Sequence, residues 1–264
     1  MADAPPGPRV LPLFRLDGEV AMITGAGDGI GRIAALTLAE AGAAVAVTDI
    51  DGEAATRVAG EIKEAGGRAE SYTLDVGESA AIIDTVSRIE ADWARIGILV
   101  NNVGIAAREP TLETTLETWE RIIALNVTAA FLCSREVGRA MVAAGSGRII
   151  NIASVMGLTG GGLYPNLAYH TSKGAIVNMT RALAVEWAQN GVRVNAIAPT
   201  YVNTKLTEKL RADKRMVARI EERTPMGRFA EPEEMAGAIL FLASRASSMV
   251  TGHALPVDGG WLAV

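Results

Sequence analysis

The most constraining feature of the sequence is a glycine-rich turn between an apolar run and a helical pattern. Residues 19–23 (Glu-Val-Ala-Met-Ile) form a short, mostly apolar run, and residues 24–31 read Thr-Gly-Ala-Gly-Asp-Gly-Ile-Gly. Residues 33–41 then have the apolar spacing of a helix. A second apolar run, 44–48, ends at Asp49. Glycines let a backbone approach a pyrophosphate closely, and the N-terminus of the following helix offers it free N–H groups. This order of segments predicts a dinucleotide-binding unit.

The same alternation of strand-like and helix-like segments continues along the chain. Further helices are expected at 51–66, 79–92, 116–144 with a break near Asn126, 169–189, 204–223 and 231–244, and further strands at 68–74, 98–100, 148–152, 192–197 and 254–257. Seven strands alternating with helices predict a Rossmann-type, doubly wound α/β fold with a mostly parallel sheet. We expect a flexible tail over residues 1–14 and a single dinucleotide-binding and catalytic domain over 15–264.

Composition and charge narrow the class of protein. The 264 residues carry a formal net charge of −5, which disfavours nucleic acid and anionic membranes as partners. The sequence has no apolar run of membrane-spanning length and no signal-peptide pattern, so we expect a cytoplasmic protein. Cys133 lies in an apolar run and is expected to be a buried thiol. His170 and His253 have no metal-ligand spacing, so we expect no metal site.

A tyrosine and a lysine, Tyr169 and Lys173, stand one helical turn apart, and Ser154 precedes them by fifteen residues. On a helix their Cβ atoms would lie roughly 5–6 Å apart. A cation at that distance favours the phenolate and lowers the tyrosine pKa from its usual value of about 10. The pair suits proton transfer near neutral pH, although a tyrosine and a lysine can also simply share a helix surface. His170 points about 100° away from Tyr169, so we expect no catalytic role for it.

With these motifs the chain resembles the short-chain dehydrogenase/reductase family from about residue 16 to residue 260. The motifs occur in the family's order: Thr24-Gly25-x-x-x-Gly29-Ile30-Gly31, Asp75, Asn101-Asn102-x-Gly104, Ser154 and Tyr169-x-x-x-Lys173, with Asn126 matching a further catalytic position. The gap of three residues between Tyr169 and Lys173 differs from the longer gap of the enoyl-reductase branch. Two positions depart from the usual pattern, since Val103 replaces an alanine and Thr200 follows Pro199 where glycine is commoner.

The resemblance implies hydride transfer between a secondary alcohol or its ketone and a nicotinamide cofactor. Tyr169 would exchange a proton with the alcohol or ketone, and Ser154 would hold the reacting oxygen. Lys173 would lower the tyrosine pKa and bind the nicotinamide ribose, and Asn126 would anchor a water connecting Lys173 to solvent. The cofactor residues implied are Gly25, Asp28, Gly29, Ile30, Gly31, Asp49, Ile50, Asp75, Val76, Asn102, Gly104, Tyr169, Lys173, Pro199, Val202 and Thr204.

The end of the second predicted strand favours NAD over NADP. A carboxylate at Asp49 would accept hydrogen bonds from the adenosine ribose hydroxyls and repel a 2′-phosphate. Asp28 stands where NADP-dependent relatives tend to carry a basic residue. No Arg or Lys falls between Asp49 and Arg57, so we expect nothing nearby to neutralise that phosphate.

The substrate is expected to be a small neutral polyol, sugar alcohol or vicinal diol. Family geometry implies a pocket lined by Ser154, Met156, Thr159, Asn166, Tyr169, Thr200 and Tyr201. No charged side chain lies between Ser154 and Tyr169 to bind a carboxylate or phosphate, although Arg108, Lys205 and Lys209 could reach the pocket from other loops.

Two other functions remain open at this point. One is a reductase of apolar ketones or 3-oxoacyl thioesters, with Met156, Leu158 and Leu163 as an apolar wall. The other is a non-catalytic NAD-binding regulator, which the intact Asn-Ser-Tyr-Lys set disfavours. Apolar surface on the predicted helices 116–144 and 169–189 indicates an interface, and the resemblance implies a homotetramer.

Overall fold

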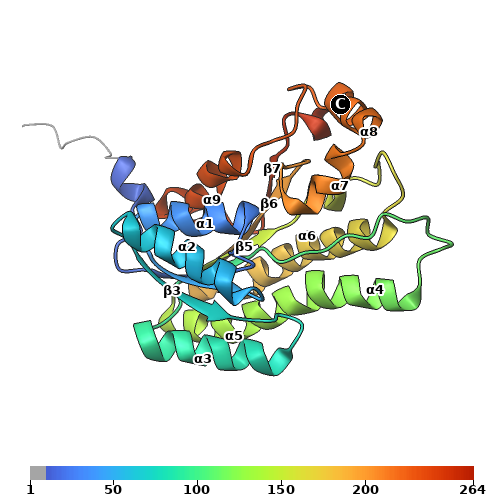
Figure 1. The fold of residues 1–264 in the computed structure, drawn as a ribbon. Coiled ribbons are helices and arrows are strands. Elements are labelled where there is room, and N and C mark those ends of the chain that lie inside the picture. Colours follow the sequence, from blue (N-terminus) through green and yellow to red (C-terminus); the bar gives the residue numbers. More distant parts are fainter. Residues whose placement is uncertain (1–9) are drawn as a thin grey trace, which may run out of the picture.

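The structure is a computed structural model that describes residues 10–264. Within this range seven strands form one parallel sheet in the order β3-β2-β1-β4-β5-β6-β7 (Figure 1). The strands are β1 (Val20–Thr24), β2 (Ala44–Asp49), β3 (Arg68–Thr73), β4 (Ile98–Asn101), β5 (Gly147–Ile152), β6 (Val192–Pro199) and β7 (Ala254–Val257). The predicted doubly wound sheet is confirmed. Its strand order reverses between β1 and β4, and sheets of this kind bind ligands at the carboxyl ends of their strands beside that point.

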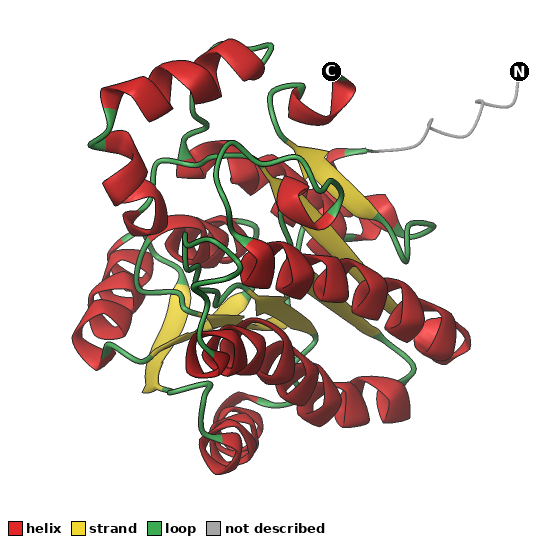
Figure 2. Ribbon diagram, turned by 90° about the vertical axis from the view of Figure 1, so that its right-hand side faces the viewer, coloured by secondary structure: helices red, strands yellow, loops and turns green. Residues whose placement is uncertain are grey.

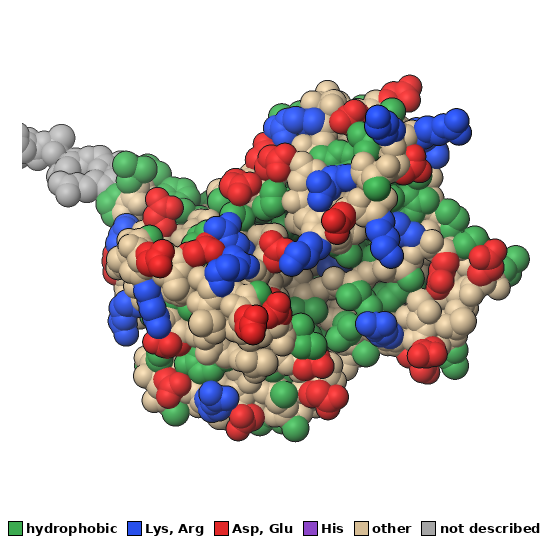
Figure 3. Space-filling model, viewed as in Figure 1, with side chains coloured by type: hydrophobic (Ala, Val, Ile, Leu, Met, Phe, Trp, Pro, Cys, Tyr) green, Lys and Arg blue, Asp and Glu red, His purple; other side chains and the backbone are tan. Residues whose placement is uncertain are grey.

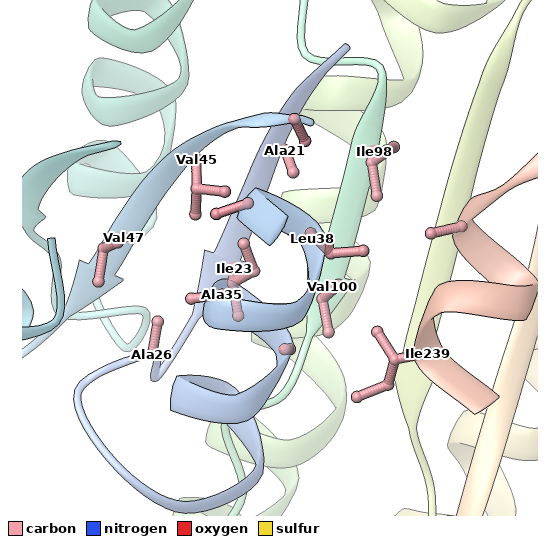
Figure 4. Close-up of a cluster of buried hydrophobic side chains, with 14 of the residues drawn as sticks. Ala21, Ile23, Ala26, Ala35, Leu38, Val45, Val47, Ile98, Val100 and Ile239 are labelled. Atoms are coloured by element: carbon pink, nitrogen blue, oxygen red, sulfur yellow. The ribbon is translucent and has the colours of Figure 1, made fainter. Parts of the chain in front are cut away.

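Helices cover both faces of the sheet (Figure 2). One face packs against α1 (Gly29–Glu40), α2 (Gly52–Glu64) and α9 (Ala236–Ala243), and the other against α3 (Ser79–Trp93), α5 (Ala129–Ala144) and α6 (Leu167–Trp187). The central strands are therefore buried on both sides and read as continuous apolar runs. In β1, Ala21 and Ile23 face the α1 side (Figure 4), while Val20 and Met22 face the opposite core.

The long helix predicted at 116–144 is interrupted where a break was expected. The α4 helix (Leu116–Ile123) ends in a π-helical turn, Ala124–Thr128, and α5 follows directly. A π turn inserts one extra residue into the helix and is frequent at functional sites. It places Asn126 in the interior, with 1% of its surface exposed.

The segment between β6 and α9 and the chain end form a small lobe above the sheet edge. It contains two short helices within the predicted 204–223 region, α7 (Glu208–Arg211) and α8 (Lys214–Arg223). Its core is a separate apolar cluster that includes Met156, Tyr201, Phe229 and Trp261. This lobe stands over the carboxyl ends of β5 and β6 and forms one wall of the site described below.

The predicted N-terminal tail falls mostly outside the described residues, which begin at Val10; within it, Leu11–Phe14 form a short 3-10 helix. Across residues 10–264, the helices are too short or too polar to cross a bilayer.

Candidate active site

A cleft of about 770 Å³ opens at the carboxyl edge of the sheet, between the lobe and the main body (Figure 3). Glycines of the turn after β1 line one end of it, and residues after β5 and β6 line the other. Its volume lies within the range of small-molecule and cofactor sites. The order of the lining segments matches the position predicted for a dinucleotide with a substrate at its inner end.

Tyr169 and Lys173 meet at the inner end of this cleft. Both project from α6, and the lysine Nζ lies 5.7 Å from the centroid of the tyrosine ring. The same Nζ donates a 2.7 Å hydrogen bond to the carbonyl of Ile152, at the end of β5. Ser154 follows that strand, and its hydroxyl accepts a 3.1 Å hydrogen bond from the Met156 amide. The sheet edge and α6 thus bring the serine, tyrosine and lysine together.

Burial dominates the acid–base properties of this group. It raises the pKa of Tyr169 to about 12, against the opposing effects of hydrogen bonding to Ser154 and of the Arg108 charge. Burial also lowers the pKa of Lys173 to about 8. The prediction of a lowered tyrosine pKa is therefore wrong for the polypeptide alone, because lost hydration outweighs the nearby cations.

Asn126 connects this group to the loop after β4. Its Nδ2 donates 2.9 Å hydrogen bonds to the Ile105 carbonyl and the Ser172 hydroxyl, and its Oδ1 accepts one of 2.8 Å from the Ile105 amide. The Ser172 hydroxyl in turn donates to the Tyr169 carbonyl at 2.8 Å. Asn126 therefore fixes the β4 loop against the first turn of α6.

The glycine turn is held tightly against α1 and β4. A Cβ on Gly31 would lie 2.1 Å from the Gly25 carbonyl oxygen, so only glycine fits there. The Asn102 amide donates hydrogen bonds of 3.0 Å and 2.9 Å to the carbonyls of Thr24 and Gly25. These contacts leave the backbone of the turn open toward the cleft, as a pyrophosphate site requires.

Asp49 lies at the outer end of the cleft, as the sequence predicted. Its carboxylate accepts hydrogen bonds from the amides of Gly27 (2.8 Å) and Asp51 (2.9 Å). The inference that no base lies nearby is wrong, because the fold brings two distant cations to this end. Arg57 donates a 2.7 Å hydrogen bond to the Gly27 carbonyl, and Lys205 pairs with Asp28 at 3.0 Å.

Most of the predicted site residues line the cleft. The cofactor set does so at Gly25, Asp28, Gly29, Ile30, Asp49, Ile50, Asp75, Val76, Asn102, Gly104, Tyr169, Lys173, Pro199, Val202 and Thr204, and the substrate set at Ser154, Met156, Asn166, Tyr169, Thr200 and Tyr201. The remaining cofactor residue, Gly31, lies outside the lining and packs against the Gly25 carbonyl within the turn. Thr159 lies outside the lining, because its hydroxyl accepts from the Gly161 amide within its own loop.

Several lining residues were absent from the predicted site, among them a charged and an aromatic one. Arg108 and Tyr164 both reach the inner end of the cleft, where the guanidinium carbon lies 5.7 Å from the centroid of the tyrosine ring. Arg108 belongs to the long loop between β4 and α4 and lies four residues beyond the Asn101-Asn102-x-Gly104 motif. Only its charge, in a loop expected to border the pocket, marked it in the sequence.

Comparisons with known proteins agree with this geometry. A family model described as "Enoyl-(Acyl carrier protein) reductase" matches residues 25–262. A 2-dehydro-3-deoxy-D-gluconate 5-dehydrogenase of Pseudoalteromonas atlantica is 42% identical over 96% of this chain and 99% of its own. A galactitol 2-dehydrogenase (L-tagatose-forming) of Cereibacter sphaeroides is 45% identical over 94% and 97%. A gluconate 5-dehydrogenase of Burkholderia cenocepacia, solved in complex with NADP and tartrate, superposes with a TM-score of 0.93 at 38% identity, covering 97% of this chain and 100% of that one.

Proposed function

The chain belongs to the short-chain dehydrogenase/reductase family, and from this premise we propose that it is an NAD(H)-dependent dehydrogenase of polyhydroxy secondary alcohols. Oxidoreduction of alcohols and ketones is the activity that its relatives' names share. The observation that carries the proposal is the meeting of Ser154, Tyr169 and Lys173 at the inner end of a cleft whose outer end is the glycine turn. A nicotinamide cofactor, when bound, supplies or accepts the hydride.

Tyr169 is the proton-transfer residue of the proposal. Its phenol would donate a proton to a ketone oxygen, or take one from an alcohol, while Ser154 holds that oxygen as its charge changes. Lys173, fixed by the Ile152 carbonyl, would favour the phenolate and bind the cofactor ribose. Asn126 would hold the β4 loop against α6 through its hydrogen bonds to Ile105 and Ser172.

A preference for NAD over NADP follows from the charges at the outer end of the cleft. The Asp49 carboxylate is held by two backbone amides and faces the position of an adenosine ribose. The two nearby cations are already paired, Arg57 with Glu61 at 2.8 Å and Lys205 with Asp28. A 2′-phosphate would therefore meet the fixed Asp49 carboxylate, while Arg57 and Lys205 are engaged in ion pairs.

The cofactor preference is tested by kcat/KM with NAD and NADP. We expect NAD to be favoured about a hundredfold, which corresponds to roughly 2.7 kcal/mol. Asp49→Ser should reduce that ratio strongly, whereas Asp84→Asn, on the exposed surface of α3, should leave it unchanged. Comparable kcat/KM values for the two cofactors in the wild-type enzyme would contradict the NAD assignment.

The inner end of the cleft supports a hydroxyl-rich substrate. Asn166 Oδ1, Thr200 Oγ1 and the Tyr201 hydroxyl are buried there without hydrogen-bond partners among the described residues. Of the three residues expected to form an apolar wall for a ketone or acyl-thioester reductase, Met156 lines the cleft, whereas Leu158 and Leu163 pack into apolar clusters outside the lining. A site that hydrogen-bonds hydroxyls rejects analogues without them.

The direct test compares polyhydroxy substrates with the matching plain secondary alcohols under NAD, followed by NADH absorbance. Polyhydroxy compounds should be oxidised with the higher kcat/KM. Better turnover of a plain alcohol, or of an apolar ketone in reverse, would favour the second candidate function. The proposal also includes a homotetramer acting in the cytoplasm, in line with the composition and the family resemblance.

A further inference from the structure

Unpartnered polar atoms gather on one part of the cleft wall. Besides the three oxygens on Asn166, Thr200 and Tyr201, the buried Nε of Arg108 has no hydrogen-bond partner within residues 10–264. Buried polar groups in native proteins are nearly always paired, and each exception requires an explanation. A guanidinium and three such oxygens on residues that line one cleft indicate a ligand that offers both hydroxyls and an anionic group.

Arg108 is held in place without its charge being neutralised. Its Nη2 donates a 2.7 Å hydrogen bond to the Leu206 carbonyl, and its guanidinium stacks near the Tyr164 ring. The ion pairs of the described residues do not include it. A partly buried guanidinium without a carboxylate partner is costly unless a ligand supplies the anion.

The Arg108 guanidinium lies near the Tyr169 phenol, the proposed proton-transfer group. Arg108 lowers the pKa of Tyr169, so the guanidinium lies close enough for its charge to act on that phenol. The glycine turn, where a pyrophosphate would bind, lines the opposite end of the cleft. NADH binding by Arg108→Gln, tested below, separates an anion on the substrate from a cofactor phosphate.

Building on the proposed function, we propose that Arg108 binds the carboxylate of the substrate, so that the enzyme acts on polyhydroxy carboxylates of the aldonate type rather than on neutral polyols. A planar guanidinium matches a carboxylate and would donate hydrogen bonds to it. Asn166, Thr200 and Tyr201 would then contact the substrate hydroxyls. This departs from the expectation of a neutral substrate, which considered only the segment between Ser154 and Tyr169.

The test uses pairs of substrates that differ only in the charged group. D-gluconate and D-glucitol are one such pair, and shorter aldonates and alditols give others. With NAD saturating, the wild-type enzyme should favour the acid of the best pair by about a hundredfold in kcat/KM. Arg108→Gln should remove most of that advantage through a higher KM for the acid, while leaving the alditol within a few-fold. Arg108→Lys should restore part of it, because it restores the charge but not the planar geometry.

Two controls separate this proposal from loss of structure. Arg219→Gln removes an exposed charge on α8 outside the cleft lining and should leave the acid-to-alditol ratio unchanged. NADH binding, followed by fluorescence, should be the same in Arg108→Gln as in the wild-type enzyme.

Three outcomes would overturn the assignment of Arg108. They are a wild-type enzyme that oxidises alditols at least as well as aldonates, an equal loss of both in Arg108→Gln, or a phosphorylated polyol that exceeds both. The first two outcomes would contradict only the role of Arg108 and would remain consistent with a dehydrogenase of polyhydroxy alcohols. Absence of NADH formation with every polyhydroxy compound would instead contradict the proposed function itself.

Discussion

At the scale of single residues, Tyr169 is the group on which the proposed chemistry depends most. Replacing it by phenylalanine removes only the hydroxyl, so kcat should fall by about a thousandfold or more, while NADH binding changes by no more than a few-fold. Tyr72→Phe is the matched control, because that phenol donates to Asp92 at 3.0 Å and lies away from the cleft lining. It should retain full activity. A Tyr169→Phe enzyme with a tenth of the wild-type rate would show that another group transfers the proton.

The pKa values of this group set the direction of the pH dependence. Alcohol oxidation needs the unprotonated phenol, and with a Tyr169 pKa of about 12 that form is scarce near neutrality. Oxidation should therefore accelerate from about pH 7 to about pH 9. Lys173, with a pKa of about 8, loses its charge in this range, so the rise should become shallower above that pH.

Ketone reduction provides the internal control for this pH profile. It needs the protonated phenol, which predominates throughout the same range, so its rate should change little. Initial rates in both directions at saturating cofactor would measure the contrast. Oxidation that slows toward alkaline pH would contradict Tyr169 as the base.

At the scale of elements, the glycine turn should tolerate almost no added volume. Gly31→Ala places a methyl group against the Gly25 carbonyl. We expect it to lower the free energy of unfolding by about 1–3 kcal/mol and to weaken NADH binding. Gly60 lies in α2 with open space around it, so Gly60→Ala should be neutral or stabilise the protein by up to about 1 kcal/mol. Chemical denaturation of the two variants measures both effects, and equal stability would show that the turn is not closely packed.

Elements and motifs were predictable from the sequence because they depend on short-range patterns. The apolar runs of the strands, the glycine turn and the break at Asn126 all follow from local spacing. Arg57 and Arg108 could not be assigned in this way. Tertiary packing brings Arg57 to the Gly27 carbonyl of the glycine turn, and brings Arg108 to the cleft at the Leu206 carbonyl. The pKa of Tyr169 was mispredicted for a related reason, since burial is a property of the folded molecule and not of the Tyr-x-x-x-Lys spacing.

At the scale of the whole molecule, the two ends of the cleft belong to different parts of the fold. The outer end is made by the sheet edge and α1, whose packing is continuous with the main core. The inner end is closed by the lobe, whose apolar cluster places Tyr201 with its ring centroid 5.3 Å from that of Trp261. In the proposed function, substrate recognition would thus depend on residues of the lobe, far from the glycine turn in sequence.

The exposed apolar side chains of α4, α5 and α6 lead us to predict that the chain assembles into a homotetramer. Leu116, Phe131, Leu167 and Val185 on these helices are all exposed, with Val185 at 83%. Large exposed apolar side chains on neighbouring helices indicate an interface. Light scattering at micromolar concentration should give four times the chain mass of 27.6 kDa. The double variant Phe131→Glu with Val185→Glu should form smaller species, because carboxylates would be buried at the interface. Ile83→Glu, also exposed but on α3, should keep the wild-type mass, and a wild-type protein of monomer mass would refute the tetramer.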